Sequence, residues 1–270
     1  MNLVCRTVEP AEHDVVETFA SAGGPADTYL LDALASDGVE GFWGAFERGT
    51  LVGAALFRRG AICGASATLR SAARPLVRAM TTRASWGSVV CPDPPGSEMV
   101  DALRGRESFR VDRRQEFFFV RRGEAIGEGE PRLRPATLRD LDALVPIVHR
   151  YRVEDGLARE GDSITGWIRD HTEGRVAAGH VFVVEEAGRI VFTGAFNFHG
   201  RHGTGLGGIY TIPEARGHGL GSRATGELIR MAFIESPVVT LHVNPKNEPA
   251  LRAYRRAGMR PAGHFRLTFR

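Results

Sequence analysis

The chain has 270 residues, of which 43% are hydrophobic and 25% charged, and its formal net charge is +3. This composition is typical of a globular protein and excludes the disordered, collagen-like and coiled-coil classes. At roughly 100–200 residues per domain, the length predicts two domains or one large one.

No apolar run approaches the roughly 18 residues that a membrane span requires, and the N-terminus has no long apolar stretch behind a basic start. Cys5, Cys63 and Cys91 are widely spaced and form no C-x-x-C pair. Neither a disulfide framework nor a cysteine zinc site is therefore expected. Together these features predict a cytoplasmic protein with no membrane partner.

The basic charge is almost entirely arginine, since Lys246 is the only lysine. The arginines are scattered among 32 acidic residues, which argues against a nucleic-acid partner. Lys246 also lies outside any Walker A loop and outside the contexts that kinases and pyridoxal-phosphate enzymes need, so these classes are excluded.

The first half of the chain alternates strand and helix patterns. Two apolar runs around Gly49 predict a hairpin at 42–55 with glycine at its turn. The other predicted elements are a strand at 6–8, a helix from Glu9 or Pro10, a helical stretch at 25–36, a strand at 61–67, a helix at 70–83, a strand at 86–90, a helix at 96–104 and a hairpin at 107–120.

Residues 122–130 are typical of a linker, being rich in glycine and glutamate with Ile126 as the single large apolar residue. They separate a first domain at 1–121 from a second at 131–270.

The second half repeats the order of the first. Thr137, with Asp140 three residues later, predicts the N-cap of a helix. A period of about 130–140 residues indicates a duplicated domain rather than a solenoid. The remaining predicted elements are a strand at 132–136, a helix near 164–168, a hairpin at 181–192, a glycine-rich strand at 204–212, a helix at 219–233, a strand at 238–243, a helix at 247–257 and a final hairpin.

Residues 208–222 contain the motif that is most specific for a chemical function. A strand ends at Pro213, and Arg216 with three alternate glycines then opens a helix. Such a turn presents unpaired backbone N–H groups and the positive end of the helix dipole, which favours a phosphate or pyrophosphate. A tight turn without a ligand is the alternative. The dinucleotide fingerprint is excluded because Ser222 takes the place of its third glycine.

The last predicted helix has an N-cap at Asn247 and a C-cap glycine at Gly258. Asn247, Ala250, Leu251 and Tyr254 are spaced to share one face. A polar amide and a tyrosine hydroxyl therefore lie along a face that is otherwise small and apolar.

At these residues the sequence resembles the GNAT superfamily of acetyl-CoA-dependent N-acetyltransferases. The run from Arg216 to Gly221 is similar to its R/Q-x-x-G-x-G/A pyrophosphate loop, and the run from Asn247 to Gly258 is similar to its N-x-x-A…Y…G helix. The whole chain is similar to tandem GNAT proteins, whose N-terminal GNAT-like domain is divergent. The implied fold class is α/β with a mixed sheet, as two GNAT-like domains in tandem with a degenerate N-terminal copy.

The resemblance implies that acetyl-CoA is the cosubstrate, without a metal, and that an amine attacks its thioester directly. The oxyanion is expected near the backbone of Ile209 or Tyr210. Tyr254 matches the tyrosine that protonates the thiolate, with core packing as the alternative role. The implied cofactor-binding residues are Ile209, Tyr210, Thr211, Arg216, Gly217, His218, Gly219, Leu220, Gly221, Ser222, Asn247 and Tyr254.

The sequence leaves the general base open, because the strand at 205–211 lacks the carboxylate that many GNAT enzymes carry there. Glu154 and His199 are retained as candidates for the base or the acceptor pocket, and an amine deprotonated through water needs no dedicated base. His199 and His202 are spaced like metal ligands but lack a third partner, so no metal is assigned. The other candidates for the base are Asp155, Glu160 and His242.

In the first half, residues 65–75 contain no Gly-x-Gly and residues 94–103 contain no tyrosine. This half is therefore interpreted as a degenerate copy without catalysis. Its favoured role is to contribute stability and a pocket wall, and binding of an effector is the alternative.

Three functions stay open: an N-acetyltransferase, an acyltransferase for another acyl-CoA, and a non-catalytic sensor of CoA or acetyl-CoA. The acceptor is expected to be a small-molecule or peptide amine, and the acidic residues within 154–162 suit a cationic one. The chain is expected to be a monomer or homodimer.

Overall fold

A computed structural model describes residues 3–35, 41–58, 60–82, 85–161 and 165–270. The predicted helical residue Ile164 and the acidic residue Asp162 lie outside these ranges. The chain divides into two compact units, of which the first comprises Met1–Phe117 and Pro261–Arg270 and the second Phe118–Arg260. The sequence predicts a boundary at 122–130, whereas the structure divides the chain at Phe117 and assigns the segment from Pro261 onwards to the first unit.

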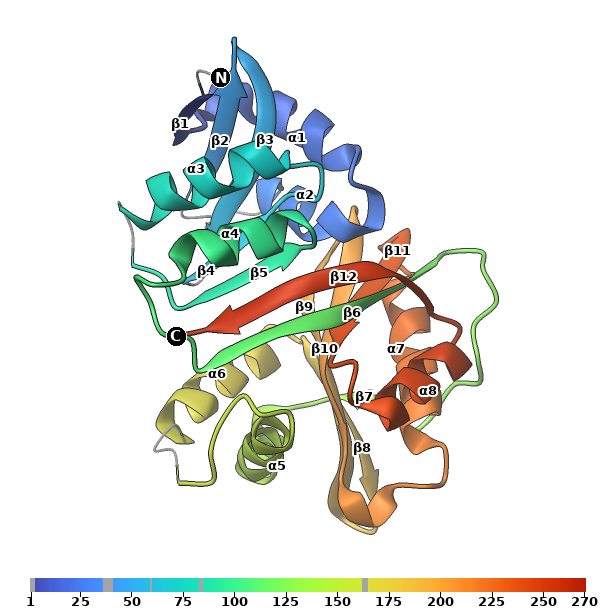
Figure 1. Cartoon of the computed structure of the whole chain (residues 1–270). Helices are drawn as coiled ribbons and strands as arrows, with labels where there is room; N and C mark the ends of the chain where they lie inside the picture. The colour runs from blue at the N-terminus through green and yellow to red at the C-terminus, as the bar shows by residue number, and fades with distance from the viewer. Residues whose placement is uncertain (1–2, 36–40, 59, 83–84, 162–164) are drawn as a thin grey trace. The chain divides into compact units, whose positions relative to one another are not determined.

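The first unit is a mixed sheet with helices packed on it (Figure 1). Its strands up to β4 are antiparallel, β4 and β5 are parallel, and β12 is antiparallel to β5. The sheet order is β1 (Leu3–Thr7), β2 (Phe42–Glu47), β3 (Thr50–Arg58), β4 (Ala61–Gly64), β5 (Ser88–Pro92), β12 (Arg260–Phe269) and β6 (Val111–Arg121). The helices are α1 (His13–Ser21), α2 (Thr28–Leu34), α3 (Arg70–Thr81) and α4 (Pro95–Leu103).

Two predicted hairpins are wrong. The pattern at 107–120 and the pattern after residue 257 each form one long strand, β6 and β12, rather than two short strands joined by a turn. Gly263 lies inside β12, and the strand continues through it. The reason is non-local: β12 pairs with β5, whose residues precede it by more than 160 positions, as in the pair Phe265–Pro92. Periodicity within a segment cannot reveal such a partner.

The second unit is built on the strand order β6, β11 (Val238–Val243), β10 (Gly203–Thr211), β9 (Arg189–Gly200), β8 (Val181–Glu186) and β7 (Arg134–Pro135). Its helices are α5 (Leu141–Glu154), α6 (Thr165–Ala177), α7 (Leu220–Ala232) and α8 (Glu248–Arg256). Its main core joins the sheet to α7 and α8, with Phe192 and Leu228 fully buried at the centre. The predicted hairpin at 181–192 is confirmed by the antiparallel pairing of β8 with β9.

β10 is paired along only part of its length on the β11 side. The two strands run parallel through the pairs Thr204–Val239 and Gly205–Thr240. Within the described residues of both strands, no register pair follows Gly205, although β10 continues to Thr211. The backbone of β10 beyond Gly205 is therefore unpaired on that side and can bind an extended ligand.

The predicted linker is packed against α7 and α8, where Figure 1 shows it as a pale green segment beside them. We call residues 123–130 the strap. The Gly127 N–H donates to the carbonyl of Ala257 at 3.2 Å. A Cβ atom at Gly226 of α7 would lie only 2.4 Å from the Glu128 carbonyl oxygen. The glycines thus allow close backbone contact, and the composition that predicts a flexible linker here produces a fixed segment of the second unit.

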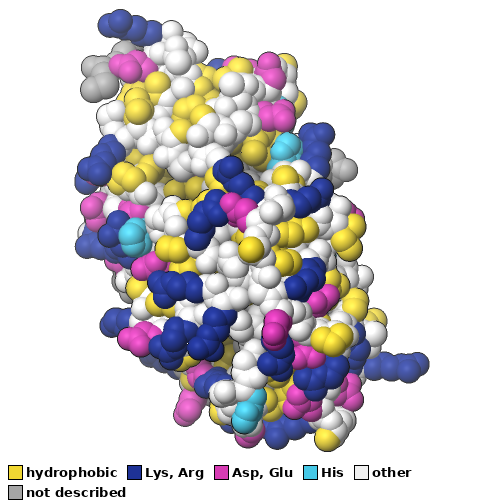
Figure 2. Space-filling model, turned by 90° about the vertical axis from the view of Figure 1, so that its right-hand side faces the viewer, with side chains coloured by type: hydrophobic (Ala, Val, Ile, Leu, Met, Phe, Trp, Pro, Cys, Tyr) yellow, Lys and Arg dark blue, Asp and Glu magenta, His cyan; other side chains and the backbone are white. Residues whose placement is uncertain are grey.

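On the face drawn in Figure 2, basic side chains are interspersed with acidic ones. No helix among the described residues is long and apolar enough to cross a membrane.

Candidate active site

The glycine turn between β10 and α7 forms an anion-binding geometry. Gly217 has φ of +88° and Gly219 has φ of +74°, values that favour glycine over any residue with a side chain. Within this described segment, the five backbone N–H groups of 217–221 have no hydrogen-bond acceptor, whereas those of Ser222 and Arg223 both donate to the Gly219 carbonyl at 3.1 Å. Free donors at the N-terminus of the 13-residue helix α7 can bind a phosphate group.

Arg216 links this loop to two other elements. Its Nε donates to the carbonyl of Thr211 at 2.9 Å, and its Nη2 donates to Glu154 at the end of α5 at 2.7 Å. The guanidinium also lies 5.1 Å from the centre of the Tyr210 ring. Since Tyr210 donates its hydroxyl proton to the same carboxylate, the three side chains form one closed set, which we call the Glu154 cluster.

The Glu154 cluster holds fixed protonation states at neutral pH. Burial opposes ionisation of Glu154, but the hydrogen bonds from Tyr210 and Arg216 outweigh it and lower the pKa of this carboxyl. Burial, together with the neighbouring carboxylate, raises the pKa of Tyr210 to about 12. Glu154 is therefore an anion and Tyr210 a neutral donor. A carboxylate with a lowered pKa is a weak proton acceptor.

Tyr254 lies on α8 with only 7% of its surface exposed. Its ring meets Phe118 edge-on, with centroids 6.3 Å apart. Burial, reinforced by Tyr151 and Asp155, raises the pKa of the phenol, so the hydroxyl is protonated at neutral pH, the form that a general acid requires. Asn247 caps this helix as predicted, since its Oδ1 accepts the Ala250 N–H at 3.2 Å.

The backbone of Ile209 lies in a bulge of β10. The register with β9 runs from Gly207–Ala195 directly to Tyr210–Thr193, so two residues of β10 lie opposite one of β9. Gly208 in this bulge has φ of +59°. Bulges redirect backbone groups, and this one occurs on the part of β10 that is unpaired toward β11, where the resemblance implies the oxyanion donor.

The structure places His199 apart from the Glu154 cluster. His199 pairs with Thr204, and its Nδ1 lies 2.6 Å from the Thr204 hydroxyl. Tyr210 lies six positions after Thr204 along β10, which is roughly 20 Å of extended chain. His242 lies on β11, where burial lowers its pKa to about 4, so its imidazole is uncharged at neutral pH.

Asp155 is the C-cap of α5 and directly follows Glu154, while Glu160 lies on an exposed turn. In the described part of the chain, no group of three or more His, Cys, Asp or Glu side chains is arranged to hold a metal ion.

Two side chains that the sequence analysis did not single out contact the site. Tyr151 lies 6.1 Å from Tyr210, ring centre to ring centre, and its position three residues before Glu154 puts it on the same face of α5. Arg223 donates to the carbonyl of His218 at 2.8 Å. The helical spacing could have indicated Tyr151, whereas Arg223 offers no such signal because its partners are in a loop and in the strap.

The first unit differs at the corresponding turn, which follows β4. β4 and β5 pair through Cys63–Val90, and the following turn is bonded to a buried carboxylate. Asp27, with 0% exposure, accepts the Ser66 backbone N–H at 2.8 Å and the Ser66 hydroxyl at 2.9 Å. Asp27 thus engages the two donors of Ser66, so that these are not available to a phosphate.

Comparison with known proteins gives a family match and a fold. Residues 141–259 match the acetyltransferase (GNAT) family, and no curated protein matches the sequence. An acetyltransferase of the GNAT family from Colwellia psychrerythraea is 13% identical, with 98% of each chain covered and a TM-score of 0.57. A GCN5-related N-acetyltransferase from Sphaerobacter thermophilus is 16% identical, with 99% of this chain and 95% of that chain covered and a TM-score of 0.58.

A tandem GNAT protein from the clavulanic acid biosynthesis pathway is 12% identical, with 99% of this chain and 98% of that chain covered and a TM-score of 0.52. GNAT-fold structures, a tandem one among them, therefore cover the whole chain, which confirms the predicted fold class. The family match and the fold thus agree: a GNAT-family segment lies within a chain whose whole length has the GNAT fold. Residues 141–259 are its GNAT domain.

Proposed function

We propose that the chain is an N-acetyltransferase that moves an acetyl group from acetyl-CoA to an amine. The observation that supports this most directly is the row of five free N–H groups at 217–221, next to the unpaired length of β10. The first feature suits a pyrophosphate, and the second suits an extended amide-containing arm. CoA contains both groups.

In the proposed reaction, a neutral amine attacks the thioester carbonyl and forms the new C–N bond. The backbone N–H groups near Ile209 and Tyr210 stabilise the oxyanion. When the C–S bond breaks, the protonated and buried Tyr254 donates its proton to the departing thiolate. The amine proton leaves through water, so that no histidine is needed near the Glu154 cluster.

The Glu154 cluster has a proposed role at the acceptor. Glu154 is ionised and lies at the C-terminal end of α5, beside Asp155. Arg216 pairs with Glu154, and the neighbouring carboxylate of Asp155 supplies the negative charge that favours a cationic acceptor. We therefore propose an acceptor that carries a second positive charge besides the reacting amine.

The test is to measure release of free CoA thiol from acetyl-CoA over a panel of polyamines, aminoglycosides, amino acids and peptide N-termini. We expect turnover with at least one amine, and a preference for acceptors with a second positive charge. Tight CoA binding without turnover on any amine would instead support the non-catalytic sensor. Faster turnover with a longer acyl-CoA would establish another acyl donor.

A further inference from the structure

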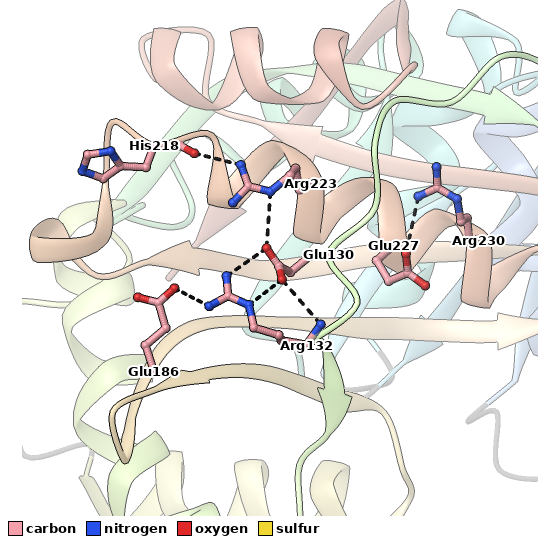
Figure 3. A network of polar contacts seen from close by, with 7 residues as sticks. All are labelled: Glu130, Arg132, Glu186, His218, Arg223, Glu227 and Arg230. Carbon is pink, nitrogen blue, oxygen red and sulfur yellow. Dashed lines mark hydrogen bonds and ion pairs between the residues drawn. The ribbon is translucent and has the colours of Figure 1, made fainter.

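A buried carboxylate of the strap is bound to two arginines (Figure 3). The Glu130 side chain is only 3% exposed, and it accepts hydrogen bonds from Arg132 at 2.7 Å and from Arg223 at 3.3 Å. Arg132 is bound in turn to Glu186 at the end of β8, at 2.8 Å. Glu130 is therefore fixed by a chain of charged contacts, and a buried carboxylate of this kind is costly unless it is paired.

Arg223 extends this chain of contacts to the glycine turn. Figure 3 shows its side chain between Glu130 and the backbone of His218, and its Nη1 donates to the His218 carbonyl at 2.8 Å. His218 lies between Gly217 and Gly219, which both have left-handed φ values. Glycine has the least restricted backbone of all residues, so this segment is intrinsically flexible. A contact that fixes a peptide plane has the largest effect in such a segment.

The planarity of the peptide bond means that the contact between Arg223 and the His218 carbonyl also orients the Gly219 N–H. In a planar trans peptide the C=O and the following N–H point in opposite directions. A His218 carbonyl held toward Arg223 therefore turns the Gly219 N–H away from Arg223. The Gly219 N–H belongs to the five free donors of 217–221.

We propose that Glu130 and Arg223 are positioning residues that hold the 217–221 turn in its anion-binding conformation. This inference rests on the proposed function and deepens it, because it assigns part of the CoA affinity to the strap. Arg223 is not itself the phosphate ligand: its charge is paired with Glu130 and its Nη1 is engaged with His218. Glu130 limits the rotamers of a side chain that is otherwise flexible.

The same helix offers a matched control. Glu227 pairs with Arg230 at 3.4 Å, and Arg230 donates to the strap carbonyl of Gly127 at 2.5 Å. This pair also joins α7 to the strap, but it lies beyond the turn, as Figure 3 shows. A general loss of strap packing would affect both pairs alike, whereas loss of loop positioning would follow only from changes at Glu130 or Arg223.

The experiment measures the Kd for CoA by calorimetry in the full chain and in the variants Glu130→Gln, Arg223→Met and Glu227→Gln. We expect Glu130→Gln and Arg223→Met to weaken CoA binding by about tenfold, and Glu227→Gln to leave it within about twofold. The double variant is expected to lose no more than either single change, because both act through one contact. Arg223→Lys keeps the charge with a single donor group and serves as a milder variant if Arg223→Met fails to fold.

A second readout separates positioning from a general structural role. S-acetyl-pantetheine is a donor without the pyrophosphate, so its kcat/KM is expected to be the same in the wild type and the Glu130 and Arg223 variants. Equal losses with both donors, or CoA affinity that is unchanged or tighter in Glu130→Gln, would overturn the positioning role. A wild-type chain that does not bind CoA would overturn the proposed function as well. The binding measurement on the wild type therefore distinguishes failure of the proposed function from failure of the positioning role alone.

Discussion

The Arg216 guanidinium donates to the Glu154 carboxylate at 2.7 Å, across 62 positions of sequence. This contact joins the loop that follows β10 to the C-terminal end of α5. The proposed cofactor turn and the proposed acceptor wall are therefore linked by one ion pair. Because both partners are partly exposed, with 45% and 39% of their side chains accessible, we assign the pair a geometric role rather than a large stabilising one.

We predict that Glu154→Gln lowers kcat by less than about tenfold, because the carboxylate is engaged by two donors and is a poor base. Glutamine keeps one acceptor for Tyr210 or Arg216, so the KM for the acceptor is expected to rise more than kcat falls. Steady-state kinetics over both substrates measures this split. A kcat loss of roughly 10²–10⁴-fold, together with loss of the acidic limb of the pH profile, would identify Glu154 as the general base instead.

We predict that Tyr254→Phe lowers kcat by about 10²-fold or more while the Kd for CoA changes by less than about threefold. The ring and its contact with Phe118 are kept, so only the hydroxyl is lost. Tyr151→Phe, at the neighbouring tyrosine, is the matched control and is expected to retain most of its turnover. Full activity of Tyr254→Phe at saturating substrates would contradict the general-acid role.

The raised pKa of Tyr254 also predicts the shape of the pH profile. A general acid is active while protonated, and burial moves the pKa of this phenol above its ordinary value of 10.0. We therefore expect that deprotonation of Tyr254 does not lower kcat at any pH below about 10. A profile of kcat in the wild type that declines with an apparent pKa near 8, and loses this decline in Tyr254→Phe, would show that the phenol titrates much lower.

We predict that Gly219→Ala weakens CoA binding by more than about tenfold. Alanine at φ of +74° costs roughly 1–2 kcal/mol, and relief of that strain would turn the N–H groups of the turn away from a bound anion. Gly179→Ala is the control, because Gly179 has φ of +72° and open space around it. Equal losses of CoA affinity in both variants would mean that strain, rather than the turn itself, causes the effect.

We predict that the stability of the first unit falls as pH rises from about 4 to about 7. Burial raises the pKa of Asp27 from 3.8 to about 7, although the Ser66 hydrogen bonds oppose the shift. The folded state therefore binds a proton that the unfolded state has released in this range, and its stability declines with pH. At 1.36 kcal/mol per pKa unit the full effect is about 4 kcal/mol.

Asp27→Asn keeps the shape of the side chain and one acceptor oxygen for Ser66, and it removes the titration. Its free energy of unfolding is expected to exceed that of the wild type at pH 8 and to vary less between pH 4 and 7. Urea unfolding followed by the fluorescence of the buried Trp43 and Trp86 measures this. Parallel pH curves for the two proteins would show that Asp27 does not titrate in this range.

The features that could be predicted from the sequence are those set by neighbours in the chain. The turn at 217–221 follows from alternate glycines before a helix, and the Asn247 cap follows from residue type and position. The contacts that complete the site join distant segments. Nothing near Glu130 indicates that it meets Arg223, and the glycines of the strap carry the same local signal whether they are mobile or packed.

The strand at 260–269 has a consequence for how the protein is made. Because β12 is needed to complete the sheet of the first unit, that unit consists of two stretches of sequence, one before and one after the second unit. During synthesis, residues 3–117 emerge early but cannot finish their sheet until residues 260–269 have left the ribosome. The edge of β5 in the nascent first unit therefore stays uncovered while the whole second unit is translated.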